Sequence, residues 1–313
     1  MLAKLPRGVH VSASLRKRQV DLLEPRFIAG GMTPFTLPDF DLDAFVRATL
    51  AEDLGGRGDI TSMATIPAAA RFGGAMDSRD AITVAGLPIA ERFFRALEPA
   101  MEIEILVEEG AEVAAGTDLM RLSGNARAML TAERSALNTV QHLSGIATMT
   151  RQYVDALAGT GATLLDTRKT IPGLRVLEKY ATRMGGATNH RMGLWDAAMI
   201  KDNHVAVAGS VEEAVRRAVA AGIESIIVEV DRVAQIEPAL NAGATHLLLD
   251  NMDLDSLRES VALVGGKVPT EASGGVRLDT IRAIGATGVT YVSVGRLTLS
   301  APAADIGLDF ALA

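Results

Sequence analysis

The stretch Ser225-Ile-Ile-Val-Glu-Val-Asp-Arg-Val-Ala-Gln-Ile-Glu-Pro-Ala-Leu-Asn-Ala-Gly-Ala-Thr-His-Leu-Leu-Leu-Asp-Asn251 contains two short apolar runs, at 225–230 and 246–250, on either side of a helix-length segment at 233–241. Apolar runs of this length predict strands that are buried on both faces. Two strands joined through a helix lie parallel, because a parallel connection needs a crossover of about this length. The stretch therefore predicts one β-α-β unit.

The same alternation continues on both sides of this unit. Further strands are predicted at 163–166, 197–201, 267–271 and 289–294, and further helices at 174–183, 211–221, 254–264 and 278–284. Regular alternation predicts an α/β fold in which helices cover a parallel sheet, and the number of units favours a β/α barrel over an open sheet.

The chain before this region has a different pattern. A helix at 41–50, a glycine-rich loop at 54–59 and several short alternating apolar stretches indicate an α+β unit between residues 39 and 131. Residues 107–122 look like the hairpin of biotinyl and lipoyl carrier domains, but no lysine occupies the turn, so no carrier function is expected. A long helical pattern begins at Thr131 and is expected to bridge the two parts.

We expect four segments along the chain. They are a disordered tail at 1–35, an N-terminal α/β sandwich domain at 36–143, a β/α barrel domain at 144–300, and a C-terminal segment at 301–313 that packs back on the N-terminal domain. Residues 1–31 hold no apolar run long enough for a signal peptide or a membrane span. One hypothesis places the true initiator at Met32.

The composition excludes several classes of protein. The 313 residues are 48% hydrophobic and 22% charged, which is ordinary usage for a globular protein. The net charge of −7 and the sequence pI of about 5.4 disfavour nucleic acid and anionic membranes as partners. The absence of cysteine excludes disulfides, thiolate metal sites and cysteine nucleophiles, and a cytoplasmic location is expected.

Nearly every predicted strand of the barrel ends in polar residues. Because the carboxyl ends of barrel strands meet at one mouth, residues that are distant in sequence should form a single ring. A small ligand with several carboxylates or phosphates is indicated by the cations of this ring and one histidine, which are Arg168, Lys169, His190, Arg191 and Lys201.

The ring also contains acidic residues and glycine-rich loops. Glu229 and Asp250 suit a hard cation such as magnesium, and a structural ion pair with a lysine of the ring is the alternative. The loops at 272–276 and 294–296 follow the last strands, where barrels often hold phosphate, although a plain glycine turn is an alternative for the first. We interpret His142 and His246 as structural histidines.

With these residues in view, the sequence resembles the quinolinate phosphoribosyltransferases, also called nicotinate-nucleotide pyrophosphorylases (carboxylating), from about Leu42 to Phe310. The motifs that carry the resemblance are Glu52-Asp-Leu, Gly58-Asp-Ile-Thr61, Thr131-Ala-Glu-Arg-Ser-Ala-Leu-Asn138, Asp166-Thr-Arg-Lys-Thr-Ile-Pro-Gly-Leu-Arg175, Glu178-Lys-Tyr-Ala, Asn189-His-Arg-Met-Gly-Leu-Trp-Asp196, Ile200-Lys-Asp-Asn-His204, Val228-Glu-Val, Leu249-Asp-Asn-Met252 and Glu271-Ala-Ser-Gly-Gly275.

The resemblance implies a fold, a reaction and an assembly. The fold is an N-terminal α/β sandwich domain followed by an incomplete β/α barrel. The reaction is transfer of the phosphoribosyl group of 5-phosphoribosyl pyrophosphate to quinolinate, with decarboxylation, to give nicotinate mononucleotide, carbon dioxide and pyrophosphate in NAD biosynthesis. The assembly is a homodimer with shared active sites, in which the N-terminal domain of one subunit covers the barrel mouth of the other.

The resemblance also implies roles for individual residues. Quinolinate would be bound by Arg134 of the partner subunit together with Arg168, His190, Arg191 and Lys201. The site for 5-phosphoribosyl pyrophosphate would consist of Thr167, Lys169, Glu229, Asp250, Ser273, Gly274, Gly275, Gly295 and Arg296. Mg2+ would be held by Glu229 and Asp250, and the expected catalytic residues are Lys201, Glu229 and Asp250.

One motif departs from the family. The family usually has a small residue after the final strand glycine and then Thr-His-Ser, whereas this chain has Gly295-Arg296-Leu-Thr-Leu299-Ser300. The family histidine near the phosphates is therefore replaced by Leu299. Arg296 is a candidate for the missing contact, and a solvent-facing Arg296 is the alternative.

Three other functions stay open from the sequence. A Schiff-base aldolase could use Lys169 or Lys201, but the arginines around them favour a multiply charged ligand. A phosphoribosyltransferase of the same fold could take another acid. A non-catalytic small-molecule binder could keep the fold without the activity.

Overall fold

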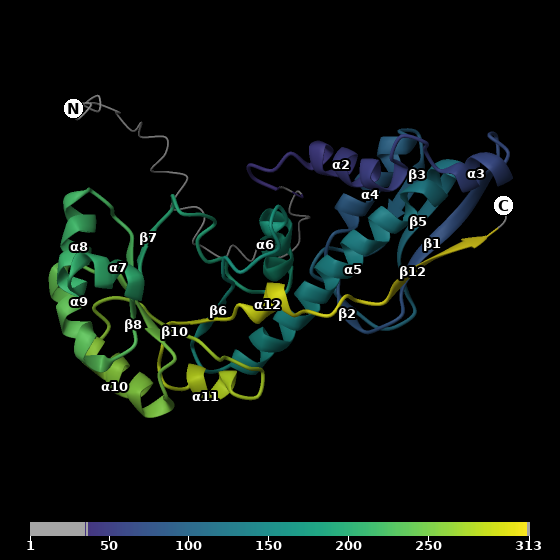
Figure 1. The fold of residues 1–313 in the computed structure, drawn as a ribbon. Coiled ribbons are helices and arrows are strands. Elements are labelled where there is room, and N and C mark those ends of the chain that lie inside the picture. Colours follow the sequence, from purple (N-terminus) through teal and green to yellow (C-terminus); the bar gives the residue numbers. More distant parts are fainter. Residues whose placement is uncertain (1–34, 36, 312–313) are drawn as a thin grey trace, which may run out of the picture. The chain divides into compact units, whose positions relative to one another are not determined.

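The computed structural model describes residue 35 and residues 37–311, so the expected tail and the proposed start at Met32 lie outside the described residues. Residues 37–311 belong to one compact unit. Its described part contains three sheets, of four, six and two strands (Figure 1).

The four-stranded sheet is antiparallel and has the order β12-β1-β5-β3. Its strands are β1 (Arg71–Ser78), β3 (Glu102–Ile105), β5 (Thr117–Asn125) and β12 (Ile306–Ala311). The helices of this part are α2 (Leu42–Leu54), α3 (Ile60–Thr65) and α4 (Leu87–Leu97). Helix α4 is strongly amphipathic, and its buried side chains include Phe93 and Phe94.

The carrier-like hairpin expected at 107–122 does not form. Strand β4 (Glu112–Val113) pairs with β2 (Ile82–Thr83), whereas β5 pairs with β1 and β3. The two strands of the expected hairpin therefore lie in different sheets, because each has a partner from elsewhere in the chain. The positive φ of 81° at Gly116 supplies the turn that separates them.

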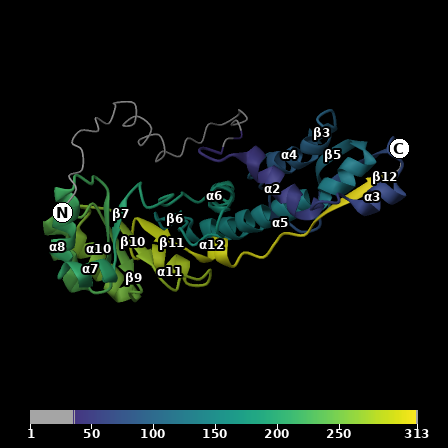
Figure 2. The same cartoon turned by 45° about the horizontal axis from the view of Figure 1, so that its top comes forward.

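Helix α5 (Ala126–Leu157) joins the two halves of the unit. It begins five residues before the predicted start at Thr131, because the side chain of Asn125 caps it by accepting a hydrogen bond from Ala128 N at 3.1 Å. One part of α5 packs against α4, and it also contacts α6 and β6 (Figures 1 and 2). Strand β12 runs alongside it on the way back to β1.

The six-stranded sheet is parallel and has the order β6-β11-β10-β9-β8-β7. Its strands are β6 (Thr163–Leu165), β7 (Ala198–Ile200), β8 (Ile226–Val230), β9 (His246–Asp250), β10 (Thr270–Ser273) and β11 (Tyr291–Ser293). The helices of this half are α6 (Arg175–Met184), α7 (Asp202–Ala208), α8 (Val211–Ala220), α9 (Ile236–Ala242) after the short η1 (Val233–Gln235), α10 (Leu254–Val264), α11 (Ile281–Gly285) and α12 (Arg296–Leu299).

The barrel does not close. Within the described residues, the edge strands β6 and β7 do not pair with each other. Thr188 instead forms a parallel bridge with Leu165, and Thr188 N donates to Leu164 O at 3.0 Å. An irregular segment thus lies along β6 in the place of a further strand. The incomplete β/α barrel with an N-terminal α/β sandwich domain is confirmed as the fold class.

The two faces of the parallel sheet differ in chemistry. One face supplies the apolar core under the helices, with Val228, Leu249 and Val292 fully buried. Residues of the opposite parity face the barrel interior, and many of them are polar. They include His246, Tyr291, Glu271, Lys201, Glu229, Asp250 and Ser273.

Two boundaries differ from the predictions for local reasons. Strand β10 begins at Thr270 rather than at Lys267, because Pro269 has no N–H for the ladder and Lys267 N instead bonds Val264 O. Helix α7, which was not predicted, begins directly after Lys201. The ring nitrogen of His204 accepts from Lys201 N at 3.1 Å and caps this helix.

The C-terminal segment crosses α5 closely at Gly145. A Cβ atom at this position would lie 2.0 Å from Pro302 O, although Gly145 is in a helix. Alanine normally stabilises a helix interior by about 1 kcal/mol relative to glycine. We expect the overlap to reverse this sign, so that Gly145→Ala lowers the free energy of unfolding by about 2 kcal/mol in urea denaturation.

Gly56→Ala is the matched control, because no heavy atom lies within 4 Å of a Cβ built at that loop position. Its stability should stay within about 0.5 kcal/mol of the original chain. A stabilised Gly145→Ala variant would contradict the close crossing.

Candidate active site

A buried carboxylate anchors the loop that follows β6. Asp166 is fully buried and accepts hydrogen bonds from Lys179 Nζ, Thr182 Oγ1 at 3.0 Å, Asn189 Nδ2 at 2.6 Å and His190 N at 2.8 Å. Lys179 also donates to His190 O at 2.9 Å. Burial lowers the pKa of Lys179, and the attraction of Asp166 opposes that effect. The pair joins the end of β6 to residues 189–190.

A second anchor lies one residue earlier on α6. The buried Glu178 accepts from His142 Nε2 at 2.9 Å and from Ile171 N at 3.1 Å. His142 thus has the structural partner expected of it. Arg168 and Lys169 lie on the short segment between the two anchors, so both ends of that segment are held by α6.

Two arginines meet at the barrel mouth. Burial and the nearby Arg168 lower the pKa of Arg191, while Asp196 acts in the opposite direction. Arg191 donates to Ala197 O at 3.1 Å, but the Nε atoms of both arginines are buried without a hydrogen-bond partner among the described residues. Two neighbouring guanidinium groups with free buried donors suit a ligand that carries carboxylates.

Lys201 and Glu229 form an ion pair on adjacent strands. Glu229 is level with Leu248 in the sheet register, and Asp250 is two residues further on the same face. The two carboxylates therefore point toward the same side, separated by about 7 Å along the strand direction. Asp250 accepts from Asn251 Nδ2 at 2.7 Å.

The glycine loops approach their neighbours closely. Gly274 has φ of 92°, and a Cβ there would lie 2.2 Å from Asn251 Oδ1. A Cβ on Gly295 would lie 2.8 Å from Lys169 Cδ, so only glycine leaves room for that lysine. Lys169 N donates to Thr167 Oγ1 at 3.0 Å, and Thr298 Oγ1 donates to Lys169 O at 2.5 Å. The structure thus brings the predicted phosphate-site residues Thr167, Lys169 and Gly295 together.

Two predicted site residues, Arg296 and Arg134, lie apart from these contacts. Arg296 is exposed at the start of α12, and Leu299 is 58% exposed at its end. Arg134 is exposed on α5, and its guanidinium pairs with the neighbouring Glu133 at 2.9 Å. No contact joins Arg134 to the cations at the mouth among the residues the structure describes.

The interior of the barrel contains an ionic cluster that the sequence did not indicate. Glu271 is fully buried, and its Oε2 lies 3.2 Å from His190 Nε2 and 3.1 Å from His246 Nε2. Burial alone would raise the pKa of Glu271, but the ring nitrogens of His190 and His246 beside its carboxylate lower it to about 2. The polar end of the 267–271 run and the motif Glu271-Ala-Ser-Gly-Gly275 marked this residue in the sequence, but neither indicated its contacts with the two histidines.

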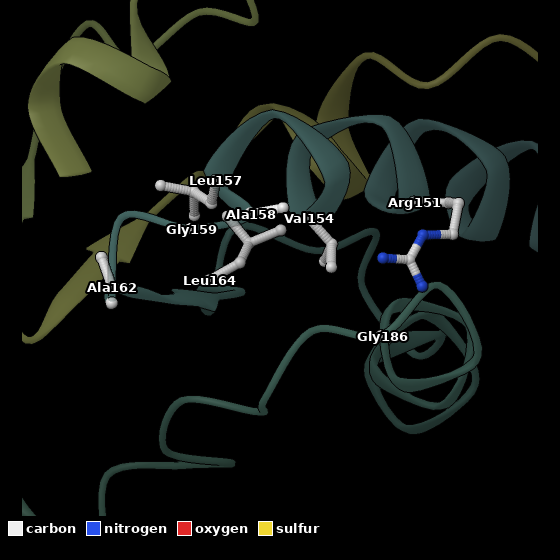
Figure 3. Close-up of a pocket in the computed structure, with 9 residues that line it drawn as sticks. Arg151, Val154, Leu157, Ala158, Gly159, Ala162, Leu164 and Gly186 are labelled. Atoms are coloured by element: carbon white, nitrogen blue, oxygen red, sulfur yellow. The ribbon is translucent and has the colours of Figure 1, made fainter. Parts of the chain in front are cut away.

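A hollow beside β6 lies outside this site, and the described chain contains no helix that could span a membrane and no cluster of three metal-binding side chains. A hollow of about 320 Å3 lies between the end of α5 and β6, where Arg151 is the only charged residue among those lining it and pairs with Asp155 at 2.7 Å (Figure 3). Over residues 37–311, no helix is long and apolar enough to cross a membrane, and no three His, Asp or Glu side chains form a metal-binding group.

Models of known protein families match most of the chain. The family model described as "Quinolinate phosphoribosyl transferase, C-terminal domain" matches residues 146–309, and that of the N-terminal domain matches residues 59–144. The chain belongs to the quinolinate phosphoribosyltransferase family.

Curated members and solved structures of this family align with nearly the whole chain. A chloroplastic nicotinate-nucleotide pyrophosphorylase [carboxylating] of Oryza sativa is 38% identical, with 97% of this chain and 84% of that protein covered. A probable member from Synechocystis is 41% identical, with 91% and 98% covered. The nicotinate-nucleotide pyrophosphorylase structure from Ehrlichia chaffeensis is 36% identical with a TM-score of 0.83, covering 87% of this chain and 100% of that chain.

The Asp166–Lys179 pair should support the stability of this quinolinate phosphoribosyltransferase family member. Lys179→Met leaves a buried carboxylate without its cation, so we expect the free energy of unfolding to fall by about 4 kcal/mol in urea denaturation. Asp166→Asn combined with Lys179→Met removes both charges and should recover part of the loss.

Arg258→Ala is the control for removal of a cation, because Arg258 pairs with Asp255 at 2.7 Å on an exposed surface. Its effect should stay below about 1 kcal/mol. If Lys179→Met were no less stable than Arg258→Ala, the buried pair would contribute no more to the free energy of unfolding than an exposed pair.

Proposed function

We propose that this chain joins quinolinate to 5-phosphoribosyl pyrophosphate and releases nicotinate mononucleotide, carbon dioxide and pyrophosphate. The observation that carries the proposal is the pair of half-buried arginines, Arg168 and Arg191, whose buried Nε donors are free beside the mouth of the barrel. Family membership and the names of the relatives support this reaction over transfer to another acid.

Quinolinate would be held through its two carboxylates. Arg168, Arg191 and Lys201 supply the positive charge, and His190 lies beside Arg191 in the same segment. Holding both carboxylates would aim the ring nitrogen at the ribose carbon, a proximity effect that can lower the barrier by several kcal/mol in well-aligned systems. No side-chain nucleophile is needed, because the ring nitrogen itself attacks.

The second substrate would lie over Lys169 and the glycine loops. Thr167, Lys169 and Gly295 are in contact with one another, and Gly274 lies against Asn251 beside Asp250. Glu229 and Asp250 would hold Mg2+, since two carboxylates on one face of adjacent strands are the hard oxygen donors that this ion prefers. When bound, Mg2+ would neutralise charge on the departing pyrophosphate.

The chain's own charges match the two difficult steps. Departure of pyrophosphate leaves positive charge on the ribose, which the carboxylates of Glu229 and Asp250 would stabilise. Loss of the 2-carboxylate leaves an electron pair at C2 of the pyridine ring, which then takes up a proton. The Lys201 ammonium would stabilise that electron pair next to the positively charged ring nitrogen.

The ion pair of Lys201 argues against the aldolase alternative. A Schiff base requires a lysine amine that is free to attack a carbonyl, whereas Lys201 Nζ is paired with the Glu229 carboxylate. Lys169 lies against Gly295 in the loop assigned to phosphate binding. Neither lysine therefore has the environment of a Schiff-base residue.

The reaction is tested with quinolinate labelled at its 2-carboxylate. We expect release of labelled carbon dioxide only when 5-phosphoribosyl pyrophosphate and Mg2+ are both added, in step with formation of nicotinate mononucleotide. Binding of quinolinate without turnover would instead identify a non-catalytic binder. Failure to bind quinolinate would point to another acid.

Arg296 is proposed to contact the phosphates in place of the family histidine. Its side chain is exposed next to Gly295 and makes no hydrogen bond or ion pair with the part of the chain that the structure describes. We expect Arg296→Ala to raise the KM for 5-phosphoribosyl pyrophosphate about tenfold, since one charge-assisted hydrogen bond is lost, without changing the KM for quinolinate.

Leu299→His restores the family residue one turn further on. Added to Arg296→Ala, it should recover part of the lost affinity for 5-phosphoribosyl pyrophosphate. An Arg296→Ala enzyme with an unchanged KM would show that this side chain points to solvent throughout the reaction.

The proposed assembly is a homodimer in which the partner subunit's Arg134 completes each quinolinate site. Three observations support it: Arg134 is exposed, it contacts no cation of its own mouth, and Leu194 and Trp195 beside the mouth are 73% and 81% exposed. Exposed apolar side chains of this size favour an interface. The proposed location is the cytoplasm, although some relatives are chloroplastic or mitochondrial.

Shared sites can be tested by mixing two inactive variants, Arg134→Ala and Lys201→Ala. A mixed dimer would contain one site in which both residues are intact, so random exchange of subunits should restore about a quarter of the original activity. Activity is measured after co-refolding of equal amounts. No recovery, with mixed dimers shown by mass spectrometry, would place Arg134 in the site of its own subunit.

A further inference from the structure

His190 has no polar atom left over for a ligand in this structure. Its backbone N–H donates to Asp166 at 2.8 Å, and its carbonyl accepts from Lys179 at 2.9 Å. Its Nδ1 accepts the N–H of Arg191 at 2.7 Å, and its Nε2 lies 3.2 Å from Glu271 Oε2. All four polar atoms are thus engaged by the protein.

These contacts determine the form of the ring. A backbone N–H can only donate, so Nδ1 must be the nitrogen without a proton. Nε2 then carries the proton and donates it to the Glu271 carboxylate. The ring of His190 is a neutral tautomer with both nitrogens occupied, and its side chain is only 8% exposed.

Glu271 holds this arrangement from inside the barrel. It is fully buried on β10, and its oxygen lies between the rings of His190 and His246, which are stacked with centroids 6.5 Å apart. His246 in turn lies 5.7 Å from the ring of Tyr291 on the neighbouring strand. Its other oxygen, Oε1, is buried without a hydrogen-bond partner among the described residues, so the contacts of Oε2 alone offset the cost of burying this carboxylate.

The next residue along the chain carries the effect to the substrate. The ring of His190 fixes the N–H of Arg191, and the guanidinium of Arg191 reaches Ala197 O and Met199 Sδ at the far edge of the gap between β6 and β7. Rotation of the His190 ring would release that N–H. The backbone from which the Arg191 side chain extends would then lose its fixed direction.

We propose that Glu271 is a positioning residue for the dicarboxylate site: it locks the ring of His190, which orients Arg191 through Nδ1 instead of giving a ring nitrogen to the substrate. The inference rests on the proposed function for the identity of the ligand. The lock itself is a property of the free protein and can be measured without any substrate.

The first test is the tautomer of His190 in protein labelled with 15N-histidine. The chain has five histidines, and the resonances of His190 are assigned by their loss in His190→Gln. We expect Nε2 protonated and Nδ1 unprotonated in the original chain and in Glu271→Gln, whose amide oxygen still accepts. Glu271→Ala should show a mixture. The opposite tautomer in the original chain, or an unchanged single tautomer in Glu271→Ala, would overturn the proposal.

The second test separates positioning from general damage to β10. Glu271→Ala should raise the KM for quinolinate about tenfold. The KM for 5-phosphoribosyl pyrophosphate should stay within about twofold of its original value, even though Ser273 of the proposed phosphate site lies on the same strand. Glu271→Gln should restore most of the affinity for quinolinate. Equal rises in both KM values would overturn the assignment.

Thr270→Val is the matched control on the same strand. Its hydroxyl accepts from Thr290 N at 3.3 Å, and its side chain faces away from Glu271. It should lower the free energy of unfolding and change the KM values for quinolinate and 5-phosphoribosyl pyrophosphate by the same factor. An original chain that shows the expected tautomer but does not turn over quinolinate would count against the proposed function alone.

Discussion

The burial of Asp166 with four hydrogen-bond donors is the constraint on which the mouth of the barrel depends. A carboxylate that is fully buried is tolerated only where its charge is paired and its lone pairs are used. Lys179, Thr182, Asn189 and His190 meet that requirement together. The same contacts join the end of β6, helix α6 and the segment before β7, so one buried charge holds three parts of the chain together.

Polar groups inside the barrel are also paired with one another. One face of the parallel strands is apolar and lies under the helices, whereas the other is lined by charges and hydroxyls that hold each other in pairs. Burial of so many polar groups favours a structure in which each has one partner and one direction. The Nε atoms of the two arginines at the mouth have no hydrogen-bond partner among the described residues, and neither does Glu271 Oε1 inside the barrel. Because the surrounding polar groups are held rigidly, the free donors at the mouth can bind a small anion without a large movement of the protein.

Much of the fold could be predicted because it depends on local patterns. The runs at 246–250 and 254–264 became β9 and α10 at the predicted residues, since both apolar period and capping residues are visible in the sequence. The hairpin expected at 107–122 does not form. Turn residues predict where the chain bends, but they do not predict which strands pair after the bend. The predicted site residues of the barrel, apart from the exposed Arg296, gather at one mouth. The roles of Lys179 and Glu271 could not be predicted, because a charge in a helix or strand does not reveal which distant side chain it meets.

The seam between β6 and β7 has a consequence for how this protein can change. In a closed barrel the wall is backbone, and residues at the mouth can vary without weakening it. Here the wall at the seam is completed by Thr188 beside β6 and by the side chain of Arg191 reaching Ala197, next to β7. Arg191, which we propose as a ligand of the acid, also holds the segment before β7 in place. A new substrate preference is therefore more accessible to evolution through the wall opposite the seam, formed by β9 and β10, than through the seam, where each change in recognition also loosens the scaffold.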